Sequence, residues 1–480
     1  MIPVRVFPGR RVGVLGLGRS GLATARALAA GGAVPVCWDD GEPARQKAAL
    51  EGFAVEDLAR PRAAADLAAL IVSPGVPVLH PEPHAAIRAA WEAEVPIDND
   101  IGLFFQALAV VGAEVRIVAV TGSNGKSTTT ALIAHSLAAA GRPVQMGGNI
   151  GRAVLDLDPP QDGETIVLEL SSYQTEIARA LAPDIAVFLN LTPDHLDRHG
   201  GMGGYFASKR RLIEQGAPSR AVIGVDDDYG RFTANNAIEP GDDPDGGAQV
   251  IRVSTTTKLR GEGWSVFMNK RFLTEWRSGR QIAAIDMGAA HALRGQHNHQ
   301  NACAAWGVLR ALGLGPRAIE PALVSFPGLP HRMEQVGEVA GVVCINDSKA
   351  TNADAAIPAL KSFERIRWIA GGKAKAGGLE AALPHMGAVI ATYLIGEAEE
   401  AFAAQLGDRA YTCCGALDAA VTAALAEAAP GEVLLFSPAC ASFDQFSDFE
   451  ARGAAFRALI DAAADAADAN AETALGGTEP

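Results

Sequence analysis

Cysteine pairs, an excess of positive charge and long apolar runs are all missing from this 480-residue chain, and each absence excludes a class of protein. The six cysteines are scattered without a Cys-x-x-Cys pair, which argues against a zinc site and favours reduced, mostly buried thiols. Lys and Arg number 41 against 55 Asp and Glu, a formal net charge of −14, so bulk binding to nucleic acid is not expected. No apolar run is clean enough to cross a bilayer, and the N-terminus lacks an apolar segment of signal-peptide type. We therefore expect a soluble cytoplasmic enzyme without membrane insertion, and a monomer.

The length and the pattern of the chain predict several α/β domains. Strand-like and helix-like segments alternate in three blocks, which indicates mainly parallel sheets. We place the domains at residues 1–105, 106–326 and 327–465. Residues 466–480 are rich in Ala, Gly and acidic side chains without apolar periodicity, and are predicted to be a frayed or disordered tail. The acidic, Gly-rich residues 241–247 are predicted to be a solvated loop.

The most informative stretch is Val-Thr-Gly-Ser-Asn-Gly-Lys-Ser-Thr, residues 120–128. It follows the strand-like residues 116–120 and precedes the helix-like residues 129–137, which is the context that a phosphate-binding loop needs. Backbone N–H groups and the helix N-terminus favour an anion, and Lys126 can reach the terminal phosphates. Either Ser127 or Thr128 can place a hydroxyl on Mg²⁺. The full pattern has a Gly at the first position, so this loop is a shortened variant. We interpret it as an ATP or GTP site, with an ordinary Gly-rich turn as the alternative.

A second Gly-rich turn lies near the start of the chain. Gly16, Gly18 and Gly21 form G-x-G-x-x-G between a strand and a helix, and Asp39 and Asp40 end the next strand. The pattern is weak by itself, because a nicotinamide dehydrogenase, a nucleotide-sugar site and a structural turn can all carry it. The phosphate-binding loop downstream argues against the dehydrogenase, since hydride transfer needs no lysine on a γ-phosphate.

Further polar side chains follow predicted strands, where α/β enzymes keep their sites. Glu169 could hold Mg²⁺. His195 and His199 are each more often structural when taken alone, but near a phosphate-binding loop His195 becomes a candidate metal ligand. Asn298 and Asn301 would share one helix face and could contact a purine or a phosphate, with helix capping as the alternative.

Together these motifs resemble the Mur ligases, and within them the branch that adds D-glutamate in peptidoglycan synthesis. The resemblance covers about residues 12–455. The phosphate-binding loop and the His-Asn-x-x-Asn run at residues 297–301 mark the superfamily, whereas residues 346–352 and 437–446 are typical of the D-glutamate-adding branch. The resemblance implies a Rossmann-like N-terminal domain for the UDP-sugar, a central P-loop ATPase domain with a mostly parallel sheet, and a C-terminal Rossmann-like α/β domain for the amino acid. It also implies ATP and Mg²⁺ as cofactors, UDP-N-acetylmuramoyl-L-alanine and D-glutamate as substrates, and an acyl-phosphate intermediate.

The resemblance assigns roles to individual residues. The catalytic residues would be Lys126, which contacts the γ-phosphate, His195, Lys209, and Arg332, which lies near ATP and substrate. Mg²⁺ would be held by Ser127, Glu169, His195 and Lys209, the last as a carbamate. ATP would contact Thr121, Gly122, Ser123, Asn124, Gly125, Lys126, Ser127, Thr128, Asn298 and Asn301. The UDP-sugar would contact Gly16, Gly18, Ser20, Asp39, Asp40, Gly75 and Asn149, and the amino acid Lys349, Thr351, Lys375, Ser442 and Phe449.

Some positions depart from the family pattern. Asp448 stands where Asn is frequent, Phe443 where Leu is usual, and Gly102 where Glu is common. Two other functions stay open at this point. A folylpolyglutamate-synthase-like ligase of the same superfamily is disfavoured by the N-terminal G-x-G-x-x-G domain. A nicotinamide-dependent oxidoreductase or a nucleotide-binding regulatory protein would use residues 16–21.

Overall fold

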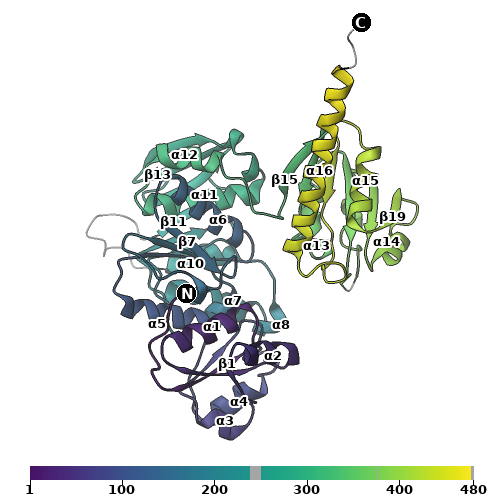
Figure 1. Ribbon diagram of the computed structural model, residues 1–480. Coiled ribbons are helices and arrows are strands. Elements are labelled where there is room, and N and C mark those ends of the chain that lie inside the picture. The colour runs from purple at the N-terminus through teal and green to yellow at the C-terminus, as the bar shows by residue number, and fades with distance from the viewer. Residues whose placement is uncertain (238–249, 376, 477–480) are drawn as a thin grey trace. The chain divides into compact units, whose positions relative to one another are not determined.

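The computed structural model describes residues 1–237, 250–375 and 377–476, with side chains up to residue 467 (Figure 1). The predicted loop at residues 241–247 lies outside this part. The chain divides into two compact units at the step from Phe326 to Pro327. The first unit contains two sheets and the second unit contains one, so the described chain has three sheets.

The N-terminal sheet has five parallel strands in the order β3-β2-β1-β4-β5. The middle strands are short apolar runs that are buried almost throughout, as a parallel sheet covered on both faces requires. The strands are β1 (Arg11–Leu15), β2 (Val34–Trp38), β3 (Ala54–Val55), β4 (Ala69–Val72) and β5 (Ile97–Asp98). The helices between them are α1 (Arg19–Ala30), α2 (Glu42–Leu50), α3 (Pro61–Ala65) and α4 (Ala85–Glu92). This arrangement confirms the Rossmann-like prediction.

The central sheet has nine strands in the order β14-β13-β12-β11-β10-β9-β6-β8-β7. All its neighbours are parallel except the pairs β12–β13 and β13–β14, which confirms a mostly parallel sheet. The strands are β6 (Arg116–Thr121), β7 (Val144–Gly148), β8 (Thr165–Glu169), β9 (Ile185–Phe188), β10 (Arg220–Gly224), β11 (Val250–Ser254), β12 (Trp264–Asn269), β13 (Phe272–Arg277) and β14 (Arg280–Asp286).

Helices cover both faces of this central sheet. The longest two, α6 (Lys126–Ala139) and α11 (Gln296–Ala311), pack against each other and share one apolar cluster with the sheet. The other helices are α5 (Asp100–Val111), α7 (Ser172–Ile177), α8 (Leu196–His199), α9 (Met202–Glu214), α10 (Asp228–Asn236) and α12 (Pro316–Val324), with short 3-10 turns at Val154–Asp156, Met287–Ala289 and His291–Leu293.

The first two predicted blocks share a continuous core. One buried apolar cluster contains Val12 and Ile71 of the N-terminal sheet together with Ile117 and Leu168 of the central sheet. The boundary predicted after residue 105 lies inside α5. The contacts therefore unite in one compact unit two sheets that the sequence pattern separates.

The second unit contains a six-stranded sheet in the order β15-β16-β20-β17-β18-β19, antiparallel only between β15 and β16. The strands are β15 (Glu334–Val339), β16 (Val342–Asn346), β17 (Ile366–Gly371), β18 (Val389–Ile395), β19 (Tyr411–Gly415) and β20 (Val433–Phe436). The helices are α13 (Ala353–Leu360), α14 (Glu399–Leu406), α15 (Leu417–Glu427) and α16 (Phe449–Gly476), with a 3-10 turn at Leu383–His385.

The end of the chain differs from its prediction. Helix α16 continues to Gly476, so residues 466–476 are helical rather than a structureless tail, and residues 477–480 lie outside the described part. This stretch is rich in Ala, which has the highest helix propensity of all residues. The prediction rests on apolar periodicity, which an Ala-rich helix need not show.

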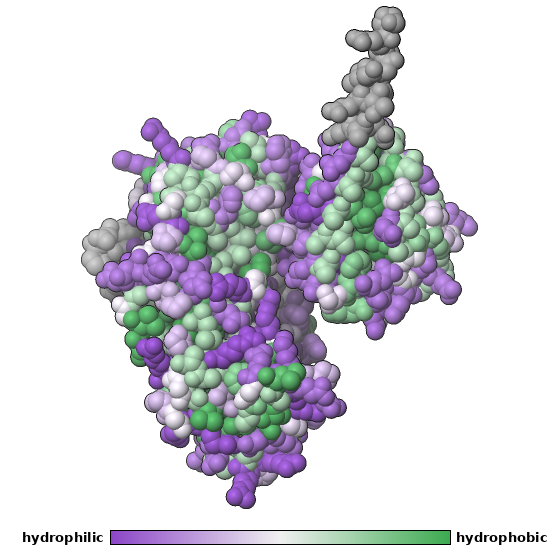
Figure 2. All heavy atoms as spheres, viewed as in Figure 1, coloured by the Kyte–Doolittle hydropathy of each residue, from purple (hydrophilic) through white to green (hydrophobic). Residues whose placement is uncertain are grey.

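Polar and apolar side chains are interspersed over the face of both units that Figure 2 shows. Among the described residues, no helix combines the length and the apolar character that crossing a bilayer demands.

Candidate active site

The predicted phosphate-binding loop connects β6 to α6 at the carboxyl edge of the central sheet. Gly122 has φ +149°, and Gly125, which caps α6, has φ +84°. Residues other than Gly rarely adopt either backbone conformation. Ser123 N donates to the backbone oxygen of Asn190, which follows β9. The strand, loop and helix predicted here are therefore confirmed, and the loop is held from the neighbouring strand.

Two lysines converge on one carbonyl oxygen of this loop. Lys126 Nζ donates to the Gly122 oxygen at 3.0 Å, and Lys209 Nζ of α9 donates to the same oxygen at 2.8 Å. The Lys209 side chain is 1% exposed, and its amine lies 4.8 Å from the centre of the Tyr205 ring. Burial, and then the charge of Lys126, hold the pKa of Lys209 well below its ordinary value. The structure thus buries Lys209 against the predicted phosphate-binding loop, whereas composition alone suggests the surface.

Glu169 ends β8 next to this loop and presents an oxygen without a partner. Its carboxylate is buried, and Oε1 accepts a hydrogen bond from Asn149 Nδ2 at 2.8 Å. Oε2 has no hydrogen-bond partner among the described residues. Ser127, also buried, begins the adjacent helix α6. A buried, unpaired carboxylate oxygen beside a phosphate-binding loop fits Mg²⁺, which prefers oxygen ligands from one or two carboxylates plus phosphates.

The two histidines have different surroundings. His195 caps α8 with φ +52°, and its Nε2 lies 3.4 Å from Asp194 Oδ2 in a half-exposed position. His199 is buried, with Nε2 2.9 Å from Ser172 Oγ, so it is a structural residue. Within residues 1–237, 250–375 and 377–467, no three His, Cys, Asp or Glu side chains are grouped to hold a metal. The role of His195 therefore stays a prediction.

The amide pair of α11 lies beside the phosphate-binding loop. Asn301 Nδ2 donates to Asn298 Oδ1 at 3.2 Å, which confirms that the two share a face. Asn301 Oδ1 accepts from Thr129 Oγ1 at 3.3 Å. A Cβ added to Gly125 would lie 2.1 Å from the same Oδ1. The absence of a side chain at Gly125 therefore allows α11 to approach the loop closely.

Asn190 and Gln300 also contact this site, although the sequence analysis does not name them as site residues. Asn190 Oδ1 accepts from the backbone N–H of Asn124 at 2.9 Å, and its Nδ2 donates to Gln300 Oε1 at 2.7 Å. Asn190 thus links the loop to α11. The available signals were its position directly after a strand and the place of Gln300 inside the His-Asn-x-x-Asn run.

The three glycines of the N-terminal Gly-rich turn have different surroundings. Gly16 has φ +85°, and a Cβ on Gly21 would lie 1.9 Å from the Gly16 oxygen, so both are required by the backbone. A Cβ on Gly18 would meet no atom within 4 Å. Leu17 N donates to Asp39 Oδ2 at 2.7 Å, which ties the turn to the end of β2. Gly18 is therefore the position that faces free space.

The remaining UDP-sugar candidates are distributed over several loops. Asp40 lies 3.2 Å from His84 Nε2, Gly75 is exposed after β4, and Ser20 lies in the first turn of α1. Asn149 contacts Glu169 of the central sheet, as described above. Gly102, a departure from the family pattern, is explained by packing, because a Cβ there would lie 1.9 Å from Asp98 Oδ1.

In the second unit, the predicted amino-acid residues follow neighbouring strands. β16 and β20 are paired, so the loops at residues 346–352 and 437–446 leave the same edge of the sheet. Lys349 Nζ lies 5.7 Å from the centre of the Phe449 ring. Ser442 is 2% exposed.

Other predicted residues of this unit lie at the surface. Arg332 and Lys375 are exposed, and Thr351 is half-buried. Phe443 is 70% exposed. Asp448 Oδ1 accepts from the backbone N–H of Ala451 at 2.6 Å, so it caps α16, a role that Asn would fill equally well.

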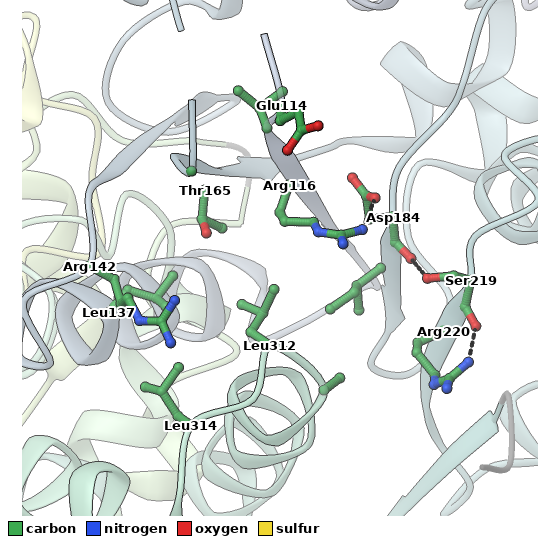
Figure 3. Close-up of a pocket in the computed structure, with 14 residues that line it drawn as sticks. Glu114, Arg116, Leu137, Arg142, Thr165, Asp184, Ser219, Arg220, Leu312 and Leu314 are labelled. Carbon is green, nitrogen blue, oxygen red and sulfur yellow. Dashed lines mark hydrogen bonds and ion pairs between the residues drawn. The ribbon is translucent and has the colours of Figure 1, made fainter. Parts of the chain in front are cut away.

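A cavity of about 820 Å³ lies away from these residues (Figure 3). Its lining includes Arg116, Thr165, Ile185 and Arg220, which stand at the amino ends of their strands. Ligands of open α/β sheets bind at the carboxyl ends. Arg116 also pairs with Asp184 at 2.9 Å. The cavity is therefore separate from the predicted nucleotide site.

Comparison with known proteins identifies the family. The Mur ligase middle domain matches residues 120–309, and the glutamate ligase domain of Mur ligases matches residues 331–440. A UDP-N-acetylmuramoylalanine–D-glutamate ligase of Cereibacter sphaeroides is 58% identical over 96% of this chain and 100% of its own length. A ligase of the same name from Ruegeria pomeroyi is 56% identical over 96% of this chain and 99% of its own.

Solved structures show the same fold at low identity. The UDP-N-acetylmuramate–alanine ligase MurC of Thermotoga maritima is 18% identical with a TM-score of 0.57, over 94% of this chain and 99% of its own. MurF of Acinetobacter baumannii is 20% identical with a TM-score of 0.53, over 74% of this chain and 80% of its own. With relatives above 55% identity over nearly its whole length, the chain belongs to the Mur ligase family, in the group of UDP-N-acetylmuramoylalanine–D-glutamate ligases.

Proposed function

We propose that this protein uses ATP to join D-glutamate to UDP-N-acetylmuramoyl-L-alanine, with ADP and phosphate as the other products, in peptidoglycan synthesis. The observation that carries the proposal is the phosphate-binding loop with Lys126, the buried Lys209 and the unpaired oxygen of Glu169 around it, in a chain with relatives of that name. The nicotinamide alternative loses its support, because the relatives are ligases over the whole chain, the Gly16–Gly21 turn included.

The reaction first needs an activated carboxyl group, because a carboxylate is a poor electrophile for an amine. The carboxylate of the L-alanyl group attacks the γ-phosphorus of ATP, the bond from that phosphorus to the bridging oxygen breaks, and ADP leaves. The amine of D-glutamate then attacks the acyl carbonyl, loses a proton, and phosphate leaves as the amide forms. Lys126 stabilises the charge on the transferring phosphoryl group by analogy with other positioned donors.

One Mg²⁺ would be held by Ser127 and Glu169, and a second Mg²⁺ by His195 and the carbamate of Lys209. Bound there, the two ions would neutralise phosphate oxygens so that two anionic reactants can approach. The metal ligands among these residues are a proposal, supported by the unpaired Glu169 oxygen and by the oxygen preference of Mg²⁺.

Lys209 is suited to carbamylation because burial, and then the charge of Lys126, lower the pKa of its amine and so favour the neutral form that reacts with CO₂. The neutral amine attacks CO₂, a C–N bond forms, and one proton is released. The neutral amine thereby becomes an anionic carbamate with two oxygen ligands. An unmodified ammonium would instead repel the metal.

The test is phosphate release from ATP by the purified chain with UDP-N-acetylmuramoyl-L-alanine, comparing D-glutamate, L-glutamate, L-lysine and no amino acid. We expect sustained release only with D-glutamate. Equal release with L-lysine would assign a different amino acid to the second unit. Release that does not depend on the UDP-sugar would overturn the proposal.

A further inference from the structure

One buried arginine of the second unit contacts the loops that carry the residues predicted to bind the amino acid. Arg452 projects from the first turns of α16 and is 1% exposed. Its Nη2 donates to the backbone oxygens of Ser348 at 2.9 Å and Cys440 at 3.0 Å, and its Nε donates to Ser348 Oγ at 3.1 Å. A single guanidinium therefore joins the loop after β16 to the loop after β20.

A third loop lies against the same group. A Cβ on Gly372, which follows β17, would lie 3.1 Å from Arg452 Nη1. Gly372 leads to Lys373, and Lys373 exchanges two backbone hydrogen bonds with Ala441 at 2.9 and 3.0 Å. In the sheet, β16, β20 and β17 are consecutive neighbours. Arg452 is thus placed where the carboxyl ends of three adjacent strands meet.

Each of these loops carries a predicted amino-acid residue close to its contact with Arg452. Lys349 directly follows Ser348, Ser442 stands two residues after Cys440, and Lys375 stands three residues after Gly372. Phe449 lies one helical turn before Arg452, and its backbone oxygen accepts from Ser348 Oγ at 2.9 Å. Movement of the guanidinium would therefore displace all of these side chains relative to one another.

The charge of Arg452 is not compensated by an ion pair. No carboxylate lies within 4.0 Å of its guanidinium among the described residues, and Nη1 is buried without a hydrogen-bond partner there. Burial lowers its pKa to about 10, which leaves the group charged at neutral pH. The charge of Asp444 acts on the guanidinium from beyond ion-pair distance. A buried cation without a direct ion pair is costly, and a further anion nearby lowers that cost.

We propose that Arg452 is the positioning residue of the amino-acid site, which sets the relative placement of its three loops and favours an acidic amino acid by a charge that has no direct ion pair. The inference rests on the proposed function, since it concerns the amino acid that the second unit binds. Arg452 does not itself touch the substrate in this account; it acts through the loops and through its charge.

The test compares Arg452→Met, which keeps much of the side-chain length without charge or donors, with Arg452→Lys, which keeps the charge and fewer donors. Arg457→Met is the matched control, because Arg457 lies on the same helix, pairs with Glu334 and is 42% exposed. Phosphate release gives KM for D-glutamate, for ATP and for UDP-N-acetylmuramoyl-L-alanine in each variant, and thermal unfolding checks the fold.

We expect Arg452→Met to raise KM for D-glutamate at least ~10-fold with the other two KM values within about twofold, since a buried charged hydrogen-bonding group is worth at least that factor. Arg452→Lys should fall between Arg452→Met and the wild type, and Arg457→Met should match the wild type. An unchanged KM for D-glutamate, or an equal rise for all three substrates, in a folded Arg452→Met would overturn the inference. If that variant does not fold, the same criterion applies to Arg452→Lys.

The wild type separates the two proposals. If it releases no phosphate with D-glutamate, the proposed function fails. If it is active and the Arg452 variants keep its KM for D-glutamate, only the inference about Arg452 fails.

Discussion

Replacing Lys209 by Met tests the charge arrangement of the phosphate site. Both lysine amines lie about 3 Å from the Gly122 oxygen, so they are at most about 6 Å apart. Two positive charges there would repel by at least about 3 kcal/mol at an effective dielectric constant of about 20, and this repulsion contributes to the lowered pKa of Lys209. A carbamate on Lys209 turns this repulsion into an attraction of similar size and supplies oxygen ligands for a metal. Met keeps the side-chain volume in a site that is 1% exposed, so the fold should survive. Removal of one such positioned group should lower kcat at least ~10²-fold.

The assay is phosphate release with all three substrates, with and without acetate or another short-chain carboxylate. We expect Lys209→Met to be nearly inactive and to recover partly with the added carboxylate. Because the pKa of Lys209 is lowered, more of its amine is in the neutral form that reacts with CO₂ than in an ordinary lysine at the same pH, and the active fraction of the wild type should rise with pH and with bicarbonate. A folded Lys209→Met variant with wild-type turnover would refute a role of Lys209 in catalysis. A wild-type rate that does not change when CO₂ is removed would refute the carbamate.

Three further predictions concern the phosphate-binding loop, the N-terminal Gly-rich turn and the start of α16. Lys126→Ala should lose at least ~10²-fold in kcat with an unchanged melting temperature, because the phosphoryl group loses its charged donor, and near-normal turnover would contradict this. Gly18→Ala should fold normally and raise KM for the UDP-sugar but not for ATP, since its Cβ would point into open space, whereas Gly21→Ala should destabilise the fold. Asp448→Asn should keep the thermal stability of the second unit, and Asp448→Ala should lower it by about 1 kcal/mol, as the loss of a helix cap does; equal melting temperatures for the two variants would show that Asp448 does not cap α16.

The local elements of the phosphate site could be predicted because their signals are local. A β-branched strand, two Gly residues at strained positions and a Lys-Ser pair at a helix start are adjacent in the sequence, and β6 and α6 follow that pattern. Lys209 is different. It stands beside Arg210 and Arg211, and three adjacent basic residues indicate a solvated helix face. Only the resemblance to the Mur ligases assigns Lys209 to the predicted phosphate site. Its burial depends on α9 packing against other elements, which one sequence does not display.

The common core of the first two blocks could not be predicted from the sequence for the same reason. Repeated strands and helices reveal where sheets occur, but Val12 and Ile117 belong to different sheets and meet only in the folded cluster. Neither residue differs from an ordinary buried strand residue. Boundaries drawn from local pattern therefore separate what apolar contacts unite.

Arg452 shows where local patterns end and packing begins. A charged residue in an Ala-rich helix suggests a solvated face, since Arg is rarely buried without a partner. The structure instead places the guanidinium where β16, β20 and β17 end, with its donors on two loop carbonyls. The predicted amino-acid residues lie in loops, and side chains on loops need a supporting group that holds them in one geometry. A long, buried donor can contact several loops at once, which a short apolar residue at the same position could not do. The side chains that define the amino-acid site can therefore vary while the anchor beneath them keeps their loops together.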